Sequence, residues 1–238
     1  EEYVNLETDL GDADTNHAGG ITVYGNRVYL TSRESVAVYS LEAVMSEPSE
    51  SSVKPVGKFP LFFEAAFVHA EDDLLYVGEF YREENYPTAE SHHILTPSGE
   101  TNTAVIAVYE LNRDSEFGFA DTVPARIYSI PGLAQGMCLT SDGKIYLSAS
   151  YGMADSHIYI YANPISTESR DKFLVETAEI PLYFLDNGNI EKTISVFPMS
   201  EEIAYVDEQI YVMCESASNK YIFGKLTGNN KLFSFSEK

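Results

Sequence analysis

The chain has 238 residues, of which 44% are hydrophobic, and this is enough apolar material for one sizeable core. Its 15 lysines and arginines face 37 aspartates and glutamates, so the formal net charge is −22. This charge repels phosphate backbones and argues against nucleic acid as a partner. It suits a small polar molecule, a cation or a basic protein surface, and no apolar run is long enough to span a membrane.

The N-terminal segment comes before the part of the chain that repeats. The chain begins at Glu1 without a methionine and shows no signal peptide, so we interpret it as a processed or excised product, which leaves room for a longer parent chain. Residues 3–10, YVNLETDL, have the pattern of an outer strand of a sheet. They belong either to a unit upstream or to the C-terminal unit.

A candidate calcium loop follows directly. Asp12, Asp14 and Asn16 have the alternate spacing of an EF-like loop. His17 stands where such a loop needs glycine, and no glutamate closes it. The alternative is a plain acidic turn in which the side chains cap the backbone.

Four segments then share one pattern: a short loop, an apolar strand, a polar turn and a second strand with tyrosine between aliphatic residues. The four central tyrosines are Tyr29, Tyr76, Tyr146 and Tyr211. A third apolar segment follows each of them, at residues 36–41, 105–111, 157–163 and 220–226. A fourth follows three of them, at residues 55–62, 125–132 and 193–199. Four antiparallel strands in a unit of about 45 residues predict an all-β fold, a β-propeller.

Chain length favours five blades, and six with a missing upstream blade or four are the alternatives. Two insertions interrupt the repeats. Residues 82–103 are polar and predict a long loop, whereas residues 163–191 contain apolar runs that predict an extra hairpin or a degenerate blade. We expect one domain over residues 1–238 and a monomer. Cys138 and Cys214 lie in apolar runs and are expected as buried free thiols, with a disulfide as the alternative.

Propeller topology places the loop before the first strand and the loop after the second strand of each blade on the same face. The loops before first strands supply His17, Glu64, Gln135 and Glu201, and the loops after second strands supply Arg33, Glu79, Tyr151 and Glu215. Oxygen and imidazole ligands suit a divalent cation such as calcium, and close carboxylates can form an acid–base pair. The alternative is a solvated lining of the axial channel.

The motifs of several enzyme classes are absent from the sequence. It has no glycine-rich phosphate loop, no paired-cysteine zinc spacing and no G-x-S-x-G elbow. His92 and His93 stand in the polar insertion without partners at metal-ligand spacing.

The segments "AQGM", "DGKIYLSASYG", "HIYIY" and "FPMSEEIAYVDEQIYVMCESASNKY" resemble a group of secreted or cell-envelope bacterial β-propellers without an assigned activity. This resemblance implies the propeller fold and an extracellular or cell-envelope location. More distantly, the layout is similar to gluconolactonase-like and strictosidine-synthase-like propellers, which hold a metal or substrate at the axial mouth. Here "SEEI" stands where the lactonase-like group favours Glu-Gly.

The favoured function is a non-enzymatic binding propeller that uses its acidic mouth. The alternatives are a metal-dependent hydrolase or lactonase at the same mouth and a purely structural repeat module.

Overall fold

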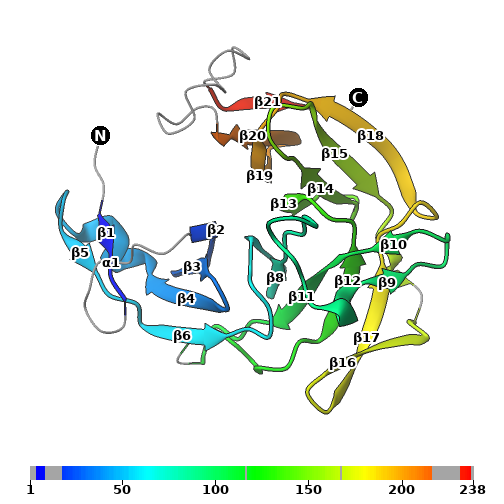
Figure 1. Ribbon diagram of the computed structural model, residues 1–238. Coiled ribbons are helices and arrows are strands. Elements are labelled where there is room, and N and C mark those ends of the chain that lie inside the picture. Colours follow the sequence, from blue (N-terminus) through cyan, green and yellow to red (C-terminus); the bar gives the residue numbers. More distant parts are fainter. Residues whose placement is uncertain (1–3, 9–17, 116, 167, 216–230, 237–238) are drawn as a thin grey trace.

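The computed structural model describes residues 4–8, 18–115, 117–166, 168–215 and 231–236, and its strands form a β-propeller of four blades (Figure 1). Blade 1 contains β2 (Ala18–Tyr24), β3 (Arg27–Ser32), β4 (Ser35–Ser40) and β6 (Gly57–Pro60). Blade 2 contains β7 (Phe67–Glu71), β8 (Leu74–Gly78), β11 (Ala104–Glu110) and β12 (Arg126–Ile130). Blade 3 contains β13 (Ala134–Leu139), β14 (Ile145–Ala149), β15 (Ser156–Tyr161) and β18 (Ile190–Val196). Blade 4 contains β19 (Ser200–Val206), β20 (Gln209–Cys214) and β21 (Phe233–Phe235).

The tyrosine-centred repeat marks the second strand of each blade, as the sequence predicts. Tyr29, Tyr76, Tyr146 and Tyr211 lie in β3, β8, β14 and β20. The first three side chains are buried, because both faces of a blade pack against neighbouring structure in this region. The third segment of the last repeat, residues 220–226, lies outside the described residues.

Four is the smallest of the three blade counts that the sequence allows, and the two insertions explain why five was favoured. Residues 82–103 form a 3₁₀ turn, η1 (Glu90–His92), and a small hairpin of β9 (Ile94–Leu95) and β10 (Thr101–Asn102) rather than a plain loop. Residues 163–191 include the short turn η2 (Pro164–Ser166) and the expected extra hairpin, β16 (Asp171–Val175) and β17 (Ala178–Phe184). Because β17 pairs in parallel with β12, this hairpin widens blade 2 instead of forming a fifth blade.

Apolar clusters join the blades in order. The cluster between blades 1 and 2 includes three aromatic rings: Phe59 stacks on Phe119 with centroids 4.3 Å apart and meets Tyr109 edge-on at 4.8 Å. Further clusters lie between blades 2 and 3 and between blades 3 and 4. The inner strands follow the same order, since β2 contacts β7, β7 contacts β13 and β13 contacts β19.

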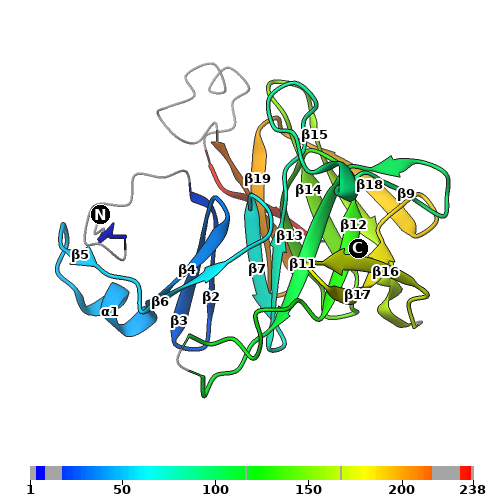
Figure 2. The same cartoon turned by 60° about the horizontal axis from the view of Figure 1, so that its bottom comes forward.

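The ring is less continuous between blades 4 and 1. In the described part of the chain β19 and β2 make no contact comparable to the other three, and Figure 1 shows these two blades apart, whereas Figure 2 shows β7 beside the strands of blade 1. Ile21 and Val23 on β2 are about half exposed, at 54% and 51%, and so are Val206 and Met213 of blade 4, at 50% and 51%.

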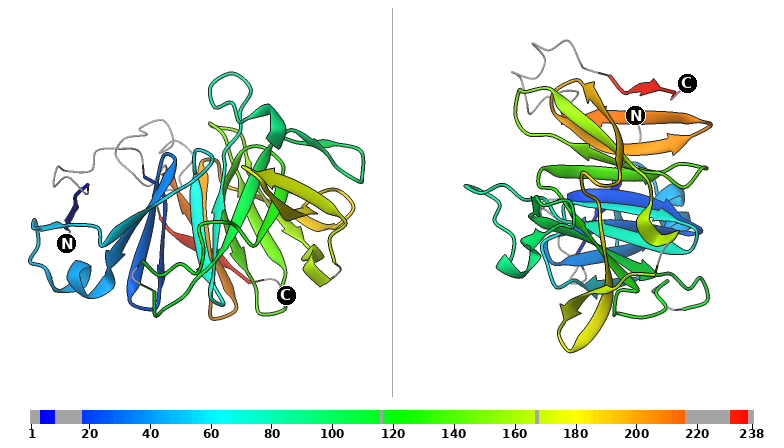
Figure 3. Two further views of the ribbon diagram at one scale, coloured as in Figure 1. Left: turned by 90° about the horizontal axis from the view of Figure 1, so that it is seen from below. Right: turned by 90° about the vertical axis from the view of Figure 1, so that its right-hand side faces the viewer.

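A small N-terminal layer covers the outer face of blade 1 (Figure 3). It contains β1 (Asn5–Leu6), β5 (Ser52–Val53) and α1 (Leu41–Ser46). β1 pairs in parallel with β5, so the described part of segment 3–10 lies in this layer and not in blade 4. Helix α1 begins directly after β4, where the Ser40 hydroxyl caps it by accepting from the Ala43 amide at 3.3 Å.

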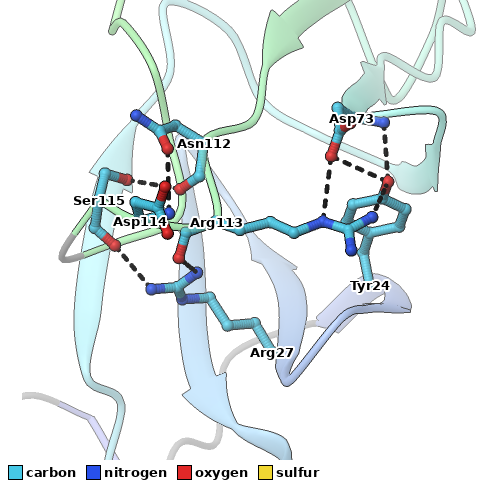
Figure 4. Close-up of polar contacts among 7 residues, drawn as sticks. All are labelled: Tyr24, Arg27, Asp73, Asn112, Arg113, Asp114 and Ser115. Carbon is cyan, nitrogen blue, oxygen red and sulfur yellow. Dashed lines mark hydrogen bonds and ion pairs between the residues drawn. The ribbon is translucent and has the colours of Figure 1, made fainter.

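The face opposite the loops of the candidate site is held by a polar clasp between blades 1 and 2 (Figure 4). The Tyr24 hydroxyl, at the end of β2, donates to Asp73 Oδ1 at 3.0 Å. Arg113, from the loop after β11, donates to that Asp73 oxygen at 3.2 Å and to the Tyr24 hydroxyl at 2.6 Å. Arg27 donates to the carbonyl groups of Arg113 and Ser115. Because every side chain in the clasp already has a partner within it, we assign it to blade docking.

Two further expectations concern the cysteines and the membrane. Cys138 and Cys214 are buried thiols that are not joined in a disulfide, as predicted, and burial raises the pKa of Cys138 far above its usual range. Among the residues that the structure describes, no helix has both the length and the apolar character that a bilayer crossing requires.

Candidate functional site

Strand register puts the loops of the candidate site at one end of every blade. In blade 2 the first residue of β7, Phe67, pairs with the last residue of β8, Gly78. The same relation joins β13 to β14 and β19 to β20, through Ala134 with Ala149 and Ser200 with Cys214. The loops before first strands and after second strands therefore share one face, which we call the mouth face.

The residues predicted for this face differ in exposure. Arg33, Glu64 and Tyr151 are exposed, whereas Gln135, Glu201 and Glu215 are partly buried. His17 and the proposed calcium ligands Asp12, Asp14 and Asn16 lie outside the described residues. Whether the predicted residues share one ligand stays a prediction.

Glu79 has a different environment from the other predicted residues. Its carboxylate is buried, and Oε2 accepts from the backbone amide of Val105 at 3.0 Å and lies 2.8 Å from His92 Nδ1. The His92 ring is also buried and lies against the ring of Phe173 at 5.4 Å. The pair joins the insertion to blade 2. The neighbouring His93 instead contacts the Thr88 hydroxyl at 3.1 Å, so the two imidazoles serve separate structural contacts.

Three of the four inner strands have an irregular register at the mouth face. The irregularities fall between Ala18 and Ile21 in β2, between Ala134 and Gly136 in β13, and between Ser200 and Ile203 in β19. A bulge adds one residue to a strand, so that two residues lie opposite one, and it disturbs the regular alternation of their side chains. In blade 4 the two residues of the bulge are the adjacent glutamates Glu201 and Glu202, opposite Met213.

Glu202 bridges inner strands of three blades. Its Oε1 accepts from the amides of Met137 at 3.3 Å and of its own neighbour Ile203 at 3.2 Å, and the Val68 amide also donates to the carboxyl group. Burial raises the pKa of Glu202 to about 8, although these three amides act in the opposite direction. Its Oε2 is buried and has no hydrogen-bond partner among the described residues. The Glu202 carboxyl group thus links inner strands around the axis at the mouth end.

Glu201 and Glu215 form a carboxyl pair at the same end of blade 4. Burial raises the pKa of Glu201 to about 8, and the charge of Glu215 and a hydrogen bond to it add to the rise, with a smaller effect from Glu202. Glu215 is held in place because its amide donates to the Met199 carbonyl at 2.9 Å. Two carboxyl groups this close share one proton more readily than they carry two charges.

The pair differs from a preformed metal site. Among the described residues, no three histidine, cysteine, aspartate or glutamate side chains lie together as a metal ion would require. A cationic group of a ligand, by contrast, needs only one or two carboxylates and could replace the shared proton.

Sequence reasoning selected Glu201 and Glu215 but missed Glu202. A signal for it is present in the repeat. When Ile21, Phe67, Met137 and Ile203 are aligned, the residues before them are Gly20, Ala66, Gly136 and Glu202. Three small residues and one glutamate in the same column indicate a single long side chain in space that the other blades leave open.

No protein-family model matches the chain, and no curated protein matches it. Similar solved structures include the computationally designed Ika4 protein, with 9% identity over 100% of this chain and 99% of that one and a TM-score of 0.41. An exo-beta-1,3-galactanase from Clostridium thermocellum has 12% identity over 90% of this chain and 45% of its own, with a TM-score of 0.44. A luciferin-regenerating enzyme has 10% identity over 86% and 72%, with a TM-score of 0.37. No function is transferred at these similarities.

Proposed function

We propose that the protein is a binding propeller whose mouth face takes a positively charged group, a protonated amine or guanidinium, at the Glu201–Glu215 pair. The observation that carries this proposal is the raised pKa of Glu201, which burial and Glu215 bring to about 8. Among the described residues no cationic side chain contributes to this pKa, so a cationic group of a ligand supplies a counter-charge to the pair. The net charge of −22 also attracts such ligands over a distance.

Binding is then linked to a proton. In the free protein below pH 8 the pair holds one proton, and the cation replaces it. The affinity therefore rises as the pH rises toward 8 and levels off above it. One linked proton with this pKa corresponds to about a tenfold increase in affinity between pH 6 and pH 7.

Calorimetry with argininamide acetylated on its α-amino group, called argininamide below, tests the proposal, because its guanidinium is then its one charged group and stays charged throughout this range. We expect proton release on binding, seen as a dependence of the heat on the buffer, and loss of binding in Glu201→Gln and Glu215→Gln. Glu208→Gln, in the exposed turn between β19 and β20, is the matched control and should bind like the wild type. Binding that is independent of pH and unaffected by Glu201→Gln would refute the proposal.

A hydrolase at the same mouth is the second candidate, since a carboxyl group with a pKa near neutrality can act as a general acid. The lactonase-like resemblance suggests a hydrolase that depends on a metal ion, and calcium is the first ion to test. Metal analysis of the purified protein and thermal unfolding with and without EDTA distinguish this form from the binding propeller. The extracellular or cell-envelope location belongs to both proposals.

A further inference from the structure

Three aromatic rings form a second feature of the mouth face, which we call the aromatic platform. It consists of Phe80 and Tyr86, from the segment after β8, and Tyr151, from the loop after β14. The Phe80 ring lies 5.3 Å from that of Tyr86, nearly perpendicular to it, and 6.4 Å from that of Tyr151. Tyr86 and Tyr151 remain 54% and 41% exposed. The platform therefore joins two blades and presents aromatic surface to solvent.

Backbone pairing holds the platform in place. The amide of Arg82 donates to the Tyr86 carbonyl, and the amide of Tyr86 donates to the Arg82 carbonyl, both at 2.9 Å. This closes residues 82–86 into a tight loop and places Tyr86 beside Phe80. A preformed set of exposed aromatic rings costs little ordering on binding, which is why tyrosine is frequent where binding energy concentrates.

One ring of the platform already carries a guanidinium group. Arg82 lies with its guanidinium carbon 4.0 Å from the centre of the Tyr151 ring. Its Nη2 donates to Glu84 Oε2 at 3.2 Å, and that carboxylate is on a largely exposed side chain. The geometry shows that the ring and its neighbouring carboxylate together accept an arginine side chain.

We propose that the aromatic platform docks arginine side chains of a basic peptide segment in a partner protein, and that Arg82 occupies this place in the free protein. Charge complementarity identifies the partner, because Glu83, Glu84 and Asp155 are exposed in the two loops that carry the rings. Arginine is favoured over lysine, since its planar group both stacks on a ring and pairs with a carboxylate. This inference rests on the proposed function only in using the same face for a basic ligand.

Fluorescence anisotropy with labelled peptides at physiological salt tests the inference. The probes are an octapeptide of alternating arginine and serine and the same peptide with lysine in place of arginine. We expect tighter binding of the arginine peptide, and a loss of about tenfold in affinity when Tyr86→Ala and Tyr151→Ala are combined. Leu174→Ala removes an exposed apolar side chain from β16 and should change nothing.

A matched pair of variants tests the role of Arg82. Arg82→Gln should strengthen binding of the arginine peptide, because it removes the internal competitor, whereas Arg170→Gln removes an equal charge from an exposed position elsewhere and should have less effect. An equal gain in affinity for the arginine peptide in both variants would mean that only the net charge affects binding. This result would refute the proposal that Arg82 competes with the peptide.

The remaining outcomes separate this inference from the proposed function. If both peptides bind equally and only Glu201→Gln or Glu215→Gln weakens them, the acidic pair binds the ligand and the platform does not. If argininamide fails to bind at the pair but the arginine peptide still depends on Tyr86 and Tyr151, the platform stands and the proposed function fails. Binding of a soluble polysaccharide that depends on the two tyrosines, without peptide binding, would overturn the platform's assignment.

Discussion

Gly136 of β13 and Glu202 of β19 lie so close that a Cβ on residue 136 would be 2.7 Å from both the Cα and the Oε1 of Glu202. The absent side chain in blade 3 therefore makes room for the carboxyl group that bridges the inner strands. Gly19 and Gly20 of β2 approach the backbone of residues 65–68 as closely, so small residues allow close packing of the inner strands at the mouth end.

Gly136→Ala should destabilise the protein by about 1–3 kcal/mol, because the methyl group meets the backbone of β19 and not only a movable side chain. Thermal unfolding followed by circular dichroism measures the effect. Gly152→Ala is the control, since its Cβ would meet nothing within 4 Å and its cost is only the strain of a left-handed residue, φ +65°, about 1–2 kcal/mol. A Gly136→Ala protein as stable as the wild type would contradict the close approach.

Stability should depend on pH through Glu202. Its pKa is about 8 in the folded protein against 4.5 as the ordinary value, so the folded state holds an extra proton between these pH values. Stability therefore falls as the pH rises from 4.5 to 8, by at most about 1.4 kcal/mol per pH unit for this group. Chemical denaturation at pH 5, 6.5 and 8 measures the slope.

Glu202→Gln removes the ionising group and should flatten this slope, while the exposed Glu208→Gln should leave it as in the wild type. The Glu201–Glu215 pair contributes in the same direction, so some slope remains in Glu202→Gln. Parallel curves for Glu202→Gln and the wild type would show that Glu202 ionises with its ordinary pKa.

The stacked rings between blades 1 and 2 should carry much of the stability of that contact. Phe119→Ala removes a ring that lies 4.3 Å from Phe59 and 5.8 Å from Tyr29, and we expect a loss of about 3 kcal/mol in the free energy of unfolding. The exposed Leu174→Ala should stay within about 0.5 kcal/mol of the wild type. A small effect of Phe119→Ala would mean that the loop after β11 does not dock on blade 1.

Removing His92 should free the insertion without unfolding the blades. His92→Ala leaves the buried Glu79 carboxylate with one partner fewer, at a cost of about 1–3 kcal/mol. Limited proteolysis should then cut within residues 82–103 much faster than in the wild type, while His157→Ala, on β15, should not change the rate there. Unchanged cutting in His92→Ala would show that the Glu79–His92 contact does not hold the insertion.

The sequence predicts the propeller well because the evidence is periodic. Alternating apolar residues and the tyrosines Tyr29, Tyr76, Tyr146 and Tyr211 fix the second strands, and topology then fixes the common face of their loops. The number of blades is harder to predict, because the apolar content of residues 163–191 fits a new blade as well as a hairpin. Only the parallel pairing of β17 with β12 separates the two, and parallel pairing has no local sequence signal.

The sequence predicts which residue types lie at the mouth face, but it does not predict the environment of each side chain. Glu79 and Glu201 are predicted for the same face of the propeller, yet one binds His92 and a backbone amide and the other faces a second carboxyl group. This difference depends on an insertion and on a bulge, and both are set by contacts far apart in the chain. The aromatic platform also depends on contacts between separate segments, because Phe80 lies against both Tyr86 and Tyr151 and Arg82 lies over the Tyr151 ring.

The most direct test of the proposed function is a carboxyl carbon NMR titration of Glu201, assigned with Glu201→Gln, in the presence and absence of saturating argininamide. The proposal predicts that the free protein titrates Glu201 with a pKa near 8 and that the ligand lowers this pKa by more than one unit, because a cation stabilises the carboxylate. A pKa close to 4.5 in the free protein, or one that saturating argininamide leaves unchanged, would contradict binding of a positively charged group at the Glu201–Glu215 pair.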